Sequence, residues 1–182
     1  MVTPDNGGID EAAIAATVEA GTDTIMVPAP LVDEAPTAAP PEFARSLHAQ
    51  LALMGMPEKI KLALRGNKEA RQILIRDSNK VIRRMVLQNP RMTDGEVLAI
   101  THNRTADDEI LRVISDRREW MRNYQVRLGL ATNPKTPIAV ALKQLGALGE
   151  RDIRALAKSR NIPQAVAVQA RRILAVRNPG AA

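Results

Sequence analysis

The chain has 182 residues, 45% of them hydrophobic and 2% aromatic, with no cysteine and a formal net charge of +6 at pH 7. This length suits one domain with a tail, and so few aromatic side chains favour packed helices over a β-sandwich. The lack of cysteine excludes disulfides and thiolate metal sites, and no apolar run reaches the roughly 18 residues that span a bilayer. The first ten residues show neither the basic nor the apolar region of a secretory signal, so we expect a cytoplasmic protein without membrane contact.

Acidic and basic residues are divided unevenly along the chain. Residues 1–44 contain eight acidic side chains and no lysine or arginine, whereas residues 45–182 carry all 26 basic side chains against 12 acidic ones. The second stretch therefore has a net charge of +14, and the pattern predicts an acidic arm joined to a basic body.

Residues 1–41 have the composition of a tail. They include six prolines, and the closing segment APTAAPP favours an extended chain. We predict that this acidic, Pro- and Ala-rich stretch is disordered. The alternative is that one of its two short apolar patches, within residues 9–20 or 24–32, docks on the basic body or on a partner.

Helices are predicted from residue 42 onward. Apolar residues suit helices over residues 42–54, 57–65 and 68–76, and the second of these ends at Gly66-Asn67. A fourth helix is expected after the cap-forming pair Asp77-Ser78.

The dipeptide Asn-Pro occurs three times, at Asn89, Asn133 and Asn178, with spacings of 44 and 45 residues. An arginine stands six positions before each asparagine: Arg83, Arg127 and Arg172. Because a residue before proline is disfavoured in the α region, each pair predicts a helix end. Self-similarity at this period is typical of paired-helix solenoids.

Helix starts are predicted between these stops. Thr93 and Glu96 have the spacing of a capping box, and Thr105 begins a looser version of the same pattern. Thr136 precedes a proline suited to the first helical position, and Pro163 opens the last predicted helix.

These patterns predict an all-α protein: a short right-handed α-solenoid of stacked helix pairs, with a period of about 44 residues and a disordered N-terminal tail. The helical repeat domain is assigned to residues 42–179. Within it, residues 42–66 form N-terminal cap helices and residues 67–179 form the repeats. Residues 180–182 are a C-terminal tail.

The recurring pattern of an apolar helix, Asn-Pro, a Thr or Pro and a Val/Ala-Leu pair resembles the HEAT-like and leucine-rich-repeat-variant α-solenoids of bacteria, among them a family without an assigned activity. NPRMTDGEVL from residue 89 and NPKTPIAVAL from residue 133 carry the pattern, and the resemblance covers roughly residues 57–179. It implies a binding role without a cofactor. The chain departs from these families in two ways. An Asp six residues before the arginine occurs only at Asp77 before Arg83, and no cysteine is present to ligate an iron–sulfur cluster.

Residues with catalytic potential are few. Phosphate-binding, zinc-protease and nucleophile-elbow motifs are absent, and the two histidines, His48 and His102, are far apart in the sequence. His102 occupies a column otherwise filled by Asn and Ser, which favours a helix-end role over acid–base chemistry. The carboxylates at residues 107–109 fall in the first turn of a predicted helix, where they complement its dipole. We therefore predict no catalytic, cofactor-binding or metal-binding residues, and a protein that is not an enzyme.

Basic side chains are the stronger candidates for a binding site. Stacked repeats bring equivalent positions into rows, so the three arginines that precede Asn-Pro are expected to form a ladder, which either satisfies helix-end carbonyls or binds anions. Trp120 and Tyr124 either form a recognition spot with neighbouring arginines or fill a groove between helices. The candidate residues for binding a partner or polyanion are Arg83, Arg84, Arg117, Arg118, Trp120, Arg122, Tyr124, Arg127, Arg171 and Arg172.

The sequence favours a non-enzymatic interaction scaffold or adaptor that presents an α-solenoid surface to a protein partner. The alternative is a nucleic-acid-binding protein whose basic helical face contacts duplex phosphates, because one Trp, one Tyr and one Phe cannot stack on many bases of a single strand. The sequence leaves the oligomeric state open.

Overall fold

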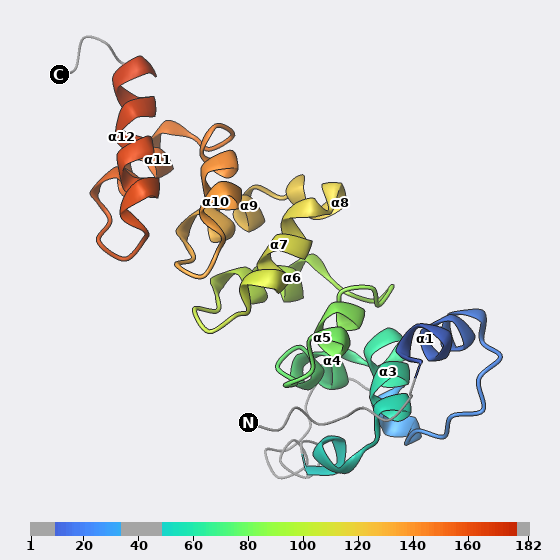
Figure 1. Cartoon of the computed structure of the whole chain (residues 1–182). Coiled ribbons are helices and arrows are strands. Elements are labelled where there is room, and N and C mark those ends of the chain that lie inside the picture. Colours follow the sequence, from blue (N-terminus) through green and yellow to red (C-terminus); the bar gives the residue numbers. More distant parts are fainter. Residues whose placement is uncertain (1–9, 34–48, 178–182) are drawn as a thin grey trace. The chain divides into compact units, whose positions relative to one another are not determined.

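The computed structural model describes residues 10–33 and 49–177, which form helices joined by turns, with no strand among them (Figure 1). The all-α prediction is confirmed for this part of the chain. The chain divides into two compact units, Met1–Met92 (unit 1) and Thr93–Ala182 (unit 2). This boundary falls inside the stretch predicted as one repeat domain, and stacking of all repeats into a single solenoid stays a prediction.

The part of unit 1 that the structure describes consists of short helices. They are α1 (Glu11–Ala20), the 3₁₀ helix η1 (Ala29–Leu31), a helical stretch at residues 49–53, α3 (Met56–Arg65), α4 (Lys68–Leu74) and α5 (Lys80–Val86). Asp10 caps α1 by accepting from two backbone N–H groups, and Gly21 ends it in the left-handed region at φ 71°. Asn79, not Asp77-Ser78, caps α5: its side chain accepts from Val81 N at 2.8 Å.

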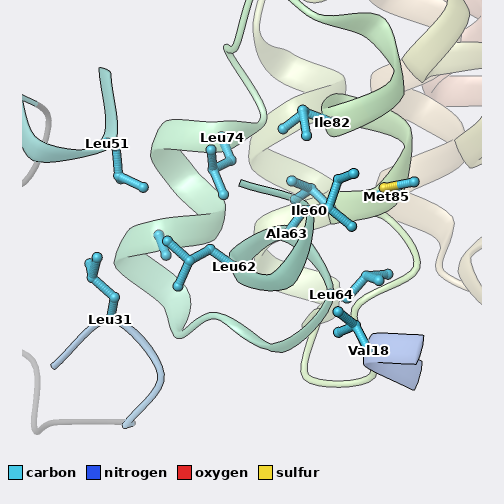
Figure 2. Packing of buried hydrophobic residues seen from close by; sticks show 12 residues of the cluster. Val18, Leu31, Leu51, Ile60, Leu62, Ala63, Leu64, Leu74, Ile82 and Met85 are labelled. Atoms are coloured by element: carbon cyan, nitrogen blue, oxygen red, sulfur yellow. The ribbon is translucent and has the colours of Figure 1, made fainter. Parts of the chain in front are cut away.

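The core of unit 1 is built around α3, which packs against α1, α4 and α5. Ile60, Leu62 and Leu64 are buried along this helix. Figure 2 shows Val18 of α1 and Leu31 of η1 pointing into the same cluster. Aliphatic side chains and one methionine, Met85, thus fill the buried cluster of this unit.

Residues 10–33 pack onto the rest of unit 1, chiefly onto α3. Val18 is 0% exposed and Leu31 is 1% exposed. The prediction of a disordered tail over residues 1–41 is therefore wrong for residues 10–33, because two aliphatic anchors supply buried area that the tail's composition did not suggest. The packing on α3 corresponds to the alternative, docking on the body. The rest of the predicted tail, residues 1–9 and 34–41, lies outside the described residues.

The division into units also divides the charge. Unit 1 contains 11 basic and 11 acidic residues, whereas unit 2 contains 15 basic and nine acidic ones. The net charge of +6 therefore belongs to unit 2. In unit 1 the acidic N-terminal residues balance the basic helices, as in the ion pair between Asp23 and Lys61 at 2.7 Å.

Replacing Asp23 by asparagine is expected to lower the free energy of unfolding of unit 1 at pH 7 by about 1 to 2 kcal/mol, because Lys61 loses a charge-assisted acceptor. The hydrogen bond from Lys61 holds the pKa of Asp23 below its usual 3.8, although burial acts in the opposite direction. A carboxylate with a lowered pKa contributes fully above its unfolded pKa, and the contribution is lost as pH falls through the folded pKa. Urea unfolding should therefore distinguish the two proteins at pH 7 and progressively less below about pH 4. Asp33→Asn, at an exposed carboxylate of the same segment, is the control and should change little.

The helices of unit 2 follow the predicted starts in part. They are α6 (Asp94–His102), α7 (Asp108–Asp116), α8 (Arg118–Met121), α9 (Tyr124–Thr132), α10 (Ile138–Leu145), α11 (Glu150–Lys158) and α12 (Gln164–Arg177). The capping box of Thr93 with Glu96 is confirmed. The looser box is wrong, because Asp107 and not Thr105 caps α7. Thr136 makes no side-chain cap, since α10 begins after Pro137 and the buried Thr136 hydroxyl has no hydrogen-bond partner among the described residues.

Small residues allow close packing in unit 2. A buried cluster of unit 2 contains Ala131, Ala141 and Ala170 beside leucines, isoleucine and valine. Gly129 of α9 faces Thr101 of α6, and a Cβ atom at Gly129 would lie 2.4 Å from the Thr101 Oγ1. The two helices meet here because glycine has no side chain.

The first of the repeated asparagines ties two helices of unit 1 together. Asn89 is 3% exposed, and its Nδ2 donates to the carbonyls of Ala63 and Gly66 at the end of α3, at 3.0 and 3.2 Å. Its Oδ1 accepts from Arg91 N at 2.9 Å. The side chain therefore satisfies helix-end carbonyls that α3 itself leaves open.

Asn133 does the same in unit 2. It is 4% exposed, and its Nδ2 donates to the carbonyls of Thr101 and Asn103 at the end of α6, at 2.7 and 2.9 Å. Its Oδ1 accepts from Lys135 N at 2.9 Å. Asn-Pro therefore ends one helix and caps an earlier one.

The third pair, at Asn178, lies outside the described residues. At the corresponding end of α10, the carbonyls of Gly146 and Leu148 accept from the guanidinium of Arg177, both at 3.0 Å. An arginine next to the third asparagine thus caps the helix end in this repeat.

Candidate interaction surface

The two candidate arginines of unit 1 lie on α5. Arg83 is half-buried, and its Nη1 donates to the Asp77 carbonyl at 3.0 Å, which is a structural contact. Arg84 is exposed and lines a shallow groove of about 440 Å³ between α1 and α5.

Trp120 is buried, with 5% of its surface exposed. The guanidinium of Arg117 lies 5.1 Å from the centre of the indole ring and 3.5 Å from the Glu119 carboxylate. The indole is therefore withdrawn from the surface, which favours the groove-filling interpretation over the recognition spot.

Tyr124 joins the start of α9 to the start of α11. Its hydroxyl donates to the Asp152 carboxylate and accepts from Gly149 N at 3.0 Å. The guanidinium of Arg127 lies 5.6 Å from the centre of the ring. The hydroxyl and the ring are thus both used inside unit 2, so neither Tyr124 nor Trp120 supplies a free aromatic surface.

Replacing Tyr124 by phenylalanine is expected to lower the free energy of unfolding of unit 2 by about 1.5 kcal/mol at pH 7, because Asp152 and Gly149 each lose a partner. The hydrogen bond to Asp152 raises the pKa of Tyr124 above its usual 10.0, since ionisation would break it, and Gly149 opposes this in part. The stabilisation is present below about pH 10 and is lost as pH rises through the raised pKa. Unfolding at pH 7 and about pH 11 should show a difference between wild type and variant that shrinks at the higher pH. A constant difference would contradict this role of the hydroxyl.

The remaining candidates differ in their surroundings. Arg118, Arg122 and Arg172 are exposed, and their side chains make no hydrogen bond or ion pair with another described residue. Arg171 is also exposed, and its Nε donates to the Ala157 carbonyl at the end of α11 at 3.0 Å.

The three arginines at the equivalent positions differ in their local contacts, and the ladder itself stays a prediction. Arg83 bonds a loop carbonyl, Arg127 stacks on a tyrosine, and Arg172 is exposed. Helix ends are instead capped by arginines at other positions: Arg65, Arg71, Arg171 and Arg177. Sequence spacing alone did not separate these capping arginines from the exposed ones.

The exposed side chains of unit 2 are predominantly basic. Between residues 93 and 177, 13 lysines and arginines are exposed against five aspartates and glutamates. Three of them, Arg151, Arg154 and Lys158, stand at i, i+3 and i+7 on α11 and so share one face. The opposite face of α11 holds the buried Ile153 and Leu156. This stripe is absent from the candidates predicted from the sequence, although its helical spacing was a readable signal.

Among the described residues, the side chains suited to metal binding do not lie together in one cluster. No group of three or more His, Asp or Glu side chains there could hold a metal ion. His102 is exposed at the last position of α6, and His48 lies outside the described residues. No helix in the described part is both long and apolar enough to cross a bilayer.

Comparison of the chain with protein-family models, curated proteins and solved structures finds no match. The resemblance to HEAT-like and leucine-rich-repeat-variant proteins therefore stays a prediction.

Proposed function

We propose that the chain is a non-enzymatic interaction protein and that unit 2 binds an acidic surface of a protein partner. The supporting observation is the excess of exposed basic over exposed acidic side chains, 13 against five, in residues 93–177. Complementary charge steers and orients association more than it sets affinity. An adaptor with a selective acidic partner fits this surface.

The stripe on α11 is the proposed centre of the interface. The side chains of Arg151 and Lys158 are exposed and bond no other described residue, while the Arg154 side chain pairs with Glu150 one turn away. Exposed ion pairs of this kind contribute little stability, so Arg154 can exchange its partner at low cost.

Charge reversal of the stripe tests the proposal. The triple variant Arg151→Glu, Arg154→Glu and Lys158→Glu in the full chain should lose a protein partner that wild type retains in a nuclease-treated pulldown. The matched control makes the same change in charge at three exposed residues of unit 1: Lys68→Glu, Arg76→Glu and Lys80→Glu. Equal loss in both variants would refute the assignment to unit 2, and loss of the partner on nuclease treatment would favour the second candidate.

Duplex nucleic acid is the second candidate. It is favoured by one observation: the arginines are exposed while Trp120 is buried and Tyr124 is bonded to Asp152. Phosphate contacts need no aromatic surface, whereas single-strand binding relies on stacking. Changing the α11 stripe to glutamine should reduce the slope of log K against log salt on a duplex by up to about 2.7, or about 0.9 for each phosphate that is no longer neutralised. An unchanged slope would exclude this face.

We further propose that the repeats form a HEAT-like or leucine-rich-repeat-variant α-solenoid with a period of about 44 residues, in a cytoplasmic protein. Support comes from the recurrent capping by Asn89 within α3–α5 and by Asn133 within α6–α9, 44 residues apart. Each asparagine occupies the same place in its helix set, as repeated units require.

A further inference from the structure

The packing of residues 10–33 on the rest of unit 1 has the form of peptide recognition. Seven main-chain carbonyls of this segment accept hydrogen bonds from residues 61–91 of the same unit. They belong to Val18, Glu19, Ile25, Pro30, Leu31, Val32 and Asp33. Donors to main-chain carbonyls hold a bound segment whatever its side chains are, as in other proteins that recognise a peptide backbone.

Four residues of the body supply these donors. Arg65 reaches the end of α1 at 2.8 and 2.9 Å, and Arg91 reaches the turn after η1 at 2.8 Å. Asn67 donates three times, from its side chain at 2.8 and 3.0 Å and from its backbone N–H at 2.8 Å. Lys61 donates to a carbonyl and to the Asp23 carboxylate, both at 2.7 Å. The donors come from α3, the turn after it and the loop after α5.

Specificity comes from three side chains of the segment. Val18 and Leu31 are buried as aliphatic anchors at its two ends, and Asp23 lies between them as the charged group. Between these anchors Ile25 and Val27 are partly buried against the same cluster, whereas Met26 is 87% exposed. Two anchors around one carboxylate define the chemistry that this surface selects.

We infer that unit 1 carries a binding surface for acidic, aliphatic peptide segments, formed by Lys61, Arg65, Asn67 and Arg91, and that residues 10–33 occupy it as a tethered intramolecular ligand. The segment is joined to the body through residues 34–48. A tether of this length gives an effective concentration on the order of millimolar, which an incoming peptide must exceed. This surface lies on unit 1 and does not depend on the function proposed for unit 2.

A labelled peptide of residues 10–33 tests the inference on the full chain. Wild type should bind it weakly, because its own segment fills the surface. The variant Val18→Ala with Asp23→Ala weakens the tethered segment and leaves the surface intact, so it should bind the peptide at least about tenfold more tightly than wild type. Adding Lys61→Ala and Arg65→Ala should reverse this gain. The same peptide carrying Asp23→Ala is the matched control and should bind more weakly.

Two outcomes would overturn the inference. One is a weakened-segment variant that keeps its helical circular dichroism and binds the peptide no better than wild type. The other is a dimer of wild type that added peptide dissociates, because the segment would then dock on a second copy.

A second measurement tests the inference if the weakened-segment variant fails to fold. A protease site introduced within residues 34–48 of the otherwise wild-type chain separates the segment from the body without altering the surface that it occupies. Exchange of the cleaved segment with labelled peptide supports a displaceable ligand. Unfolding on cleavage, or retention without exchange, shows that the segment is an integral part of the core and refutes the inference.

Discussion

Asn133→Ala is expected to lower the free energy of unfolding of unit 2 by about 3 kcal/mol. The substitution removes two hydrogen bonds to the end of α6 and one from Lys135 N, at a side chain that is 4% exposed. The carbonyls of Thr101 and Asn103 then lose this donor in a site that water reaches poorly, so each loss costs more than that of an exposed hydrogen bond. Urea unfolding and hydrogen exchange should place the destabilisation in unit 2.

Two further variants separate this role from simple capping. Asn133→Asp keeps the acceptor for Lys135 but sets a carboxylate against two carbonyls, so it should destabilise at least as much as alanine. Asn123→Ala removes an N-cap whose side chain accepts from Gln125 N at 3.0 Å and also makes one long, exposed hydrogen bond to Asp94 at 3.3 Å, so it should cost only about 1 kcal/mol. Equal effects of Asn133→Ala and Asn123→Ala would contradict the proposed cross-link between helices.

Gly129→Ala is expected to cost about 2 kcal/mol, because the new methyl group meets a side chain that cannot move away. A Cβ atom there would lie 2.4 Å from the Oγ1 and 2.9 Å from the Cβ of Thr101, which is 0% exposed. Helix α9 must therefore shift away from α6, which loosens the packing between them. Thermal or urea unfolding measures the effect.

A double-mutant cycle checks the steric origin. Thr101→Ala removes the nearer atom, so the pair Gly129→Ala with Thr101→Ala should cost less than the sum of the single changes. Gly146→Ala is the matched control, because no atom lies within 4 Å of its added Cβ and its φ of −59° suits alanine. Wild-type stability in Gly129→Ala, or strict additivity in the cycle, would refute a steric clash between the two helices.

Side chains with distant partners are the ones that prediction from the sequence placed wrongly or left open. Arg127 and Arg172 share a repeat position, yet one stacks on Tyr124 and the other is exposed. Their equivalence in sequence did not extend to their surroundings. Trp120 was open to two interpretations because burial depends on which helices surround it.

The N-terminal segment shows the same limit. Its prolines and acidic residues are typical of disorder, so docking through the two apolar patches that contain Val18 and Leu31 was only the alternative prediction. Their pockets are formed by helices more than 20 residues further along the chain. Only the folded body shows that the segment has a surface to occupy.

The sequence by itself determined the helical class, the capping box at Thr93 and the helix end at Gly66, because helical hydrogen bonds and caps connect residues only a few positions apart. It also indicated that Asn-Pro marks a boundary. Only the tertiary structure decided that the Asn89 and Asn133 side chains reach back 23 to 32 residues to cap another helix. It also decided which arginines remain exposed, because both outcomes depend on neighbours that local sequence does not specify.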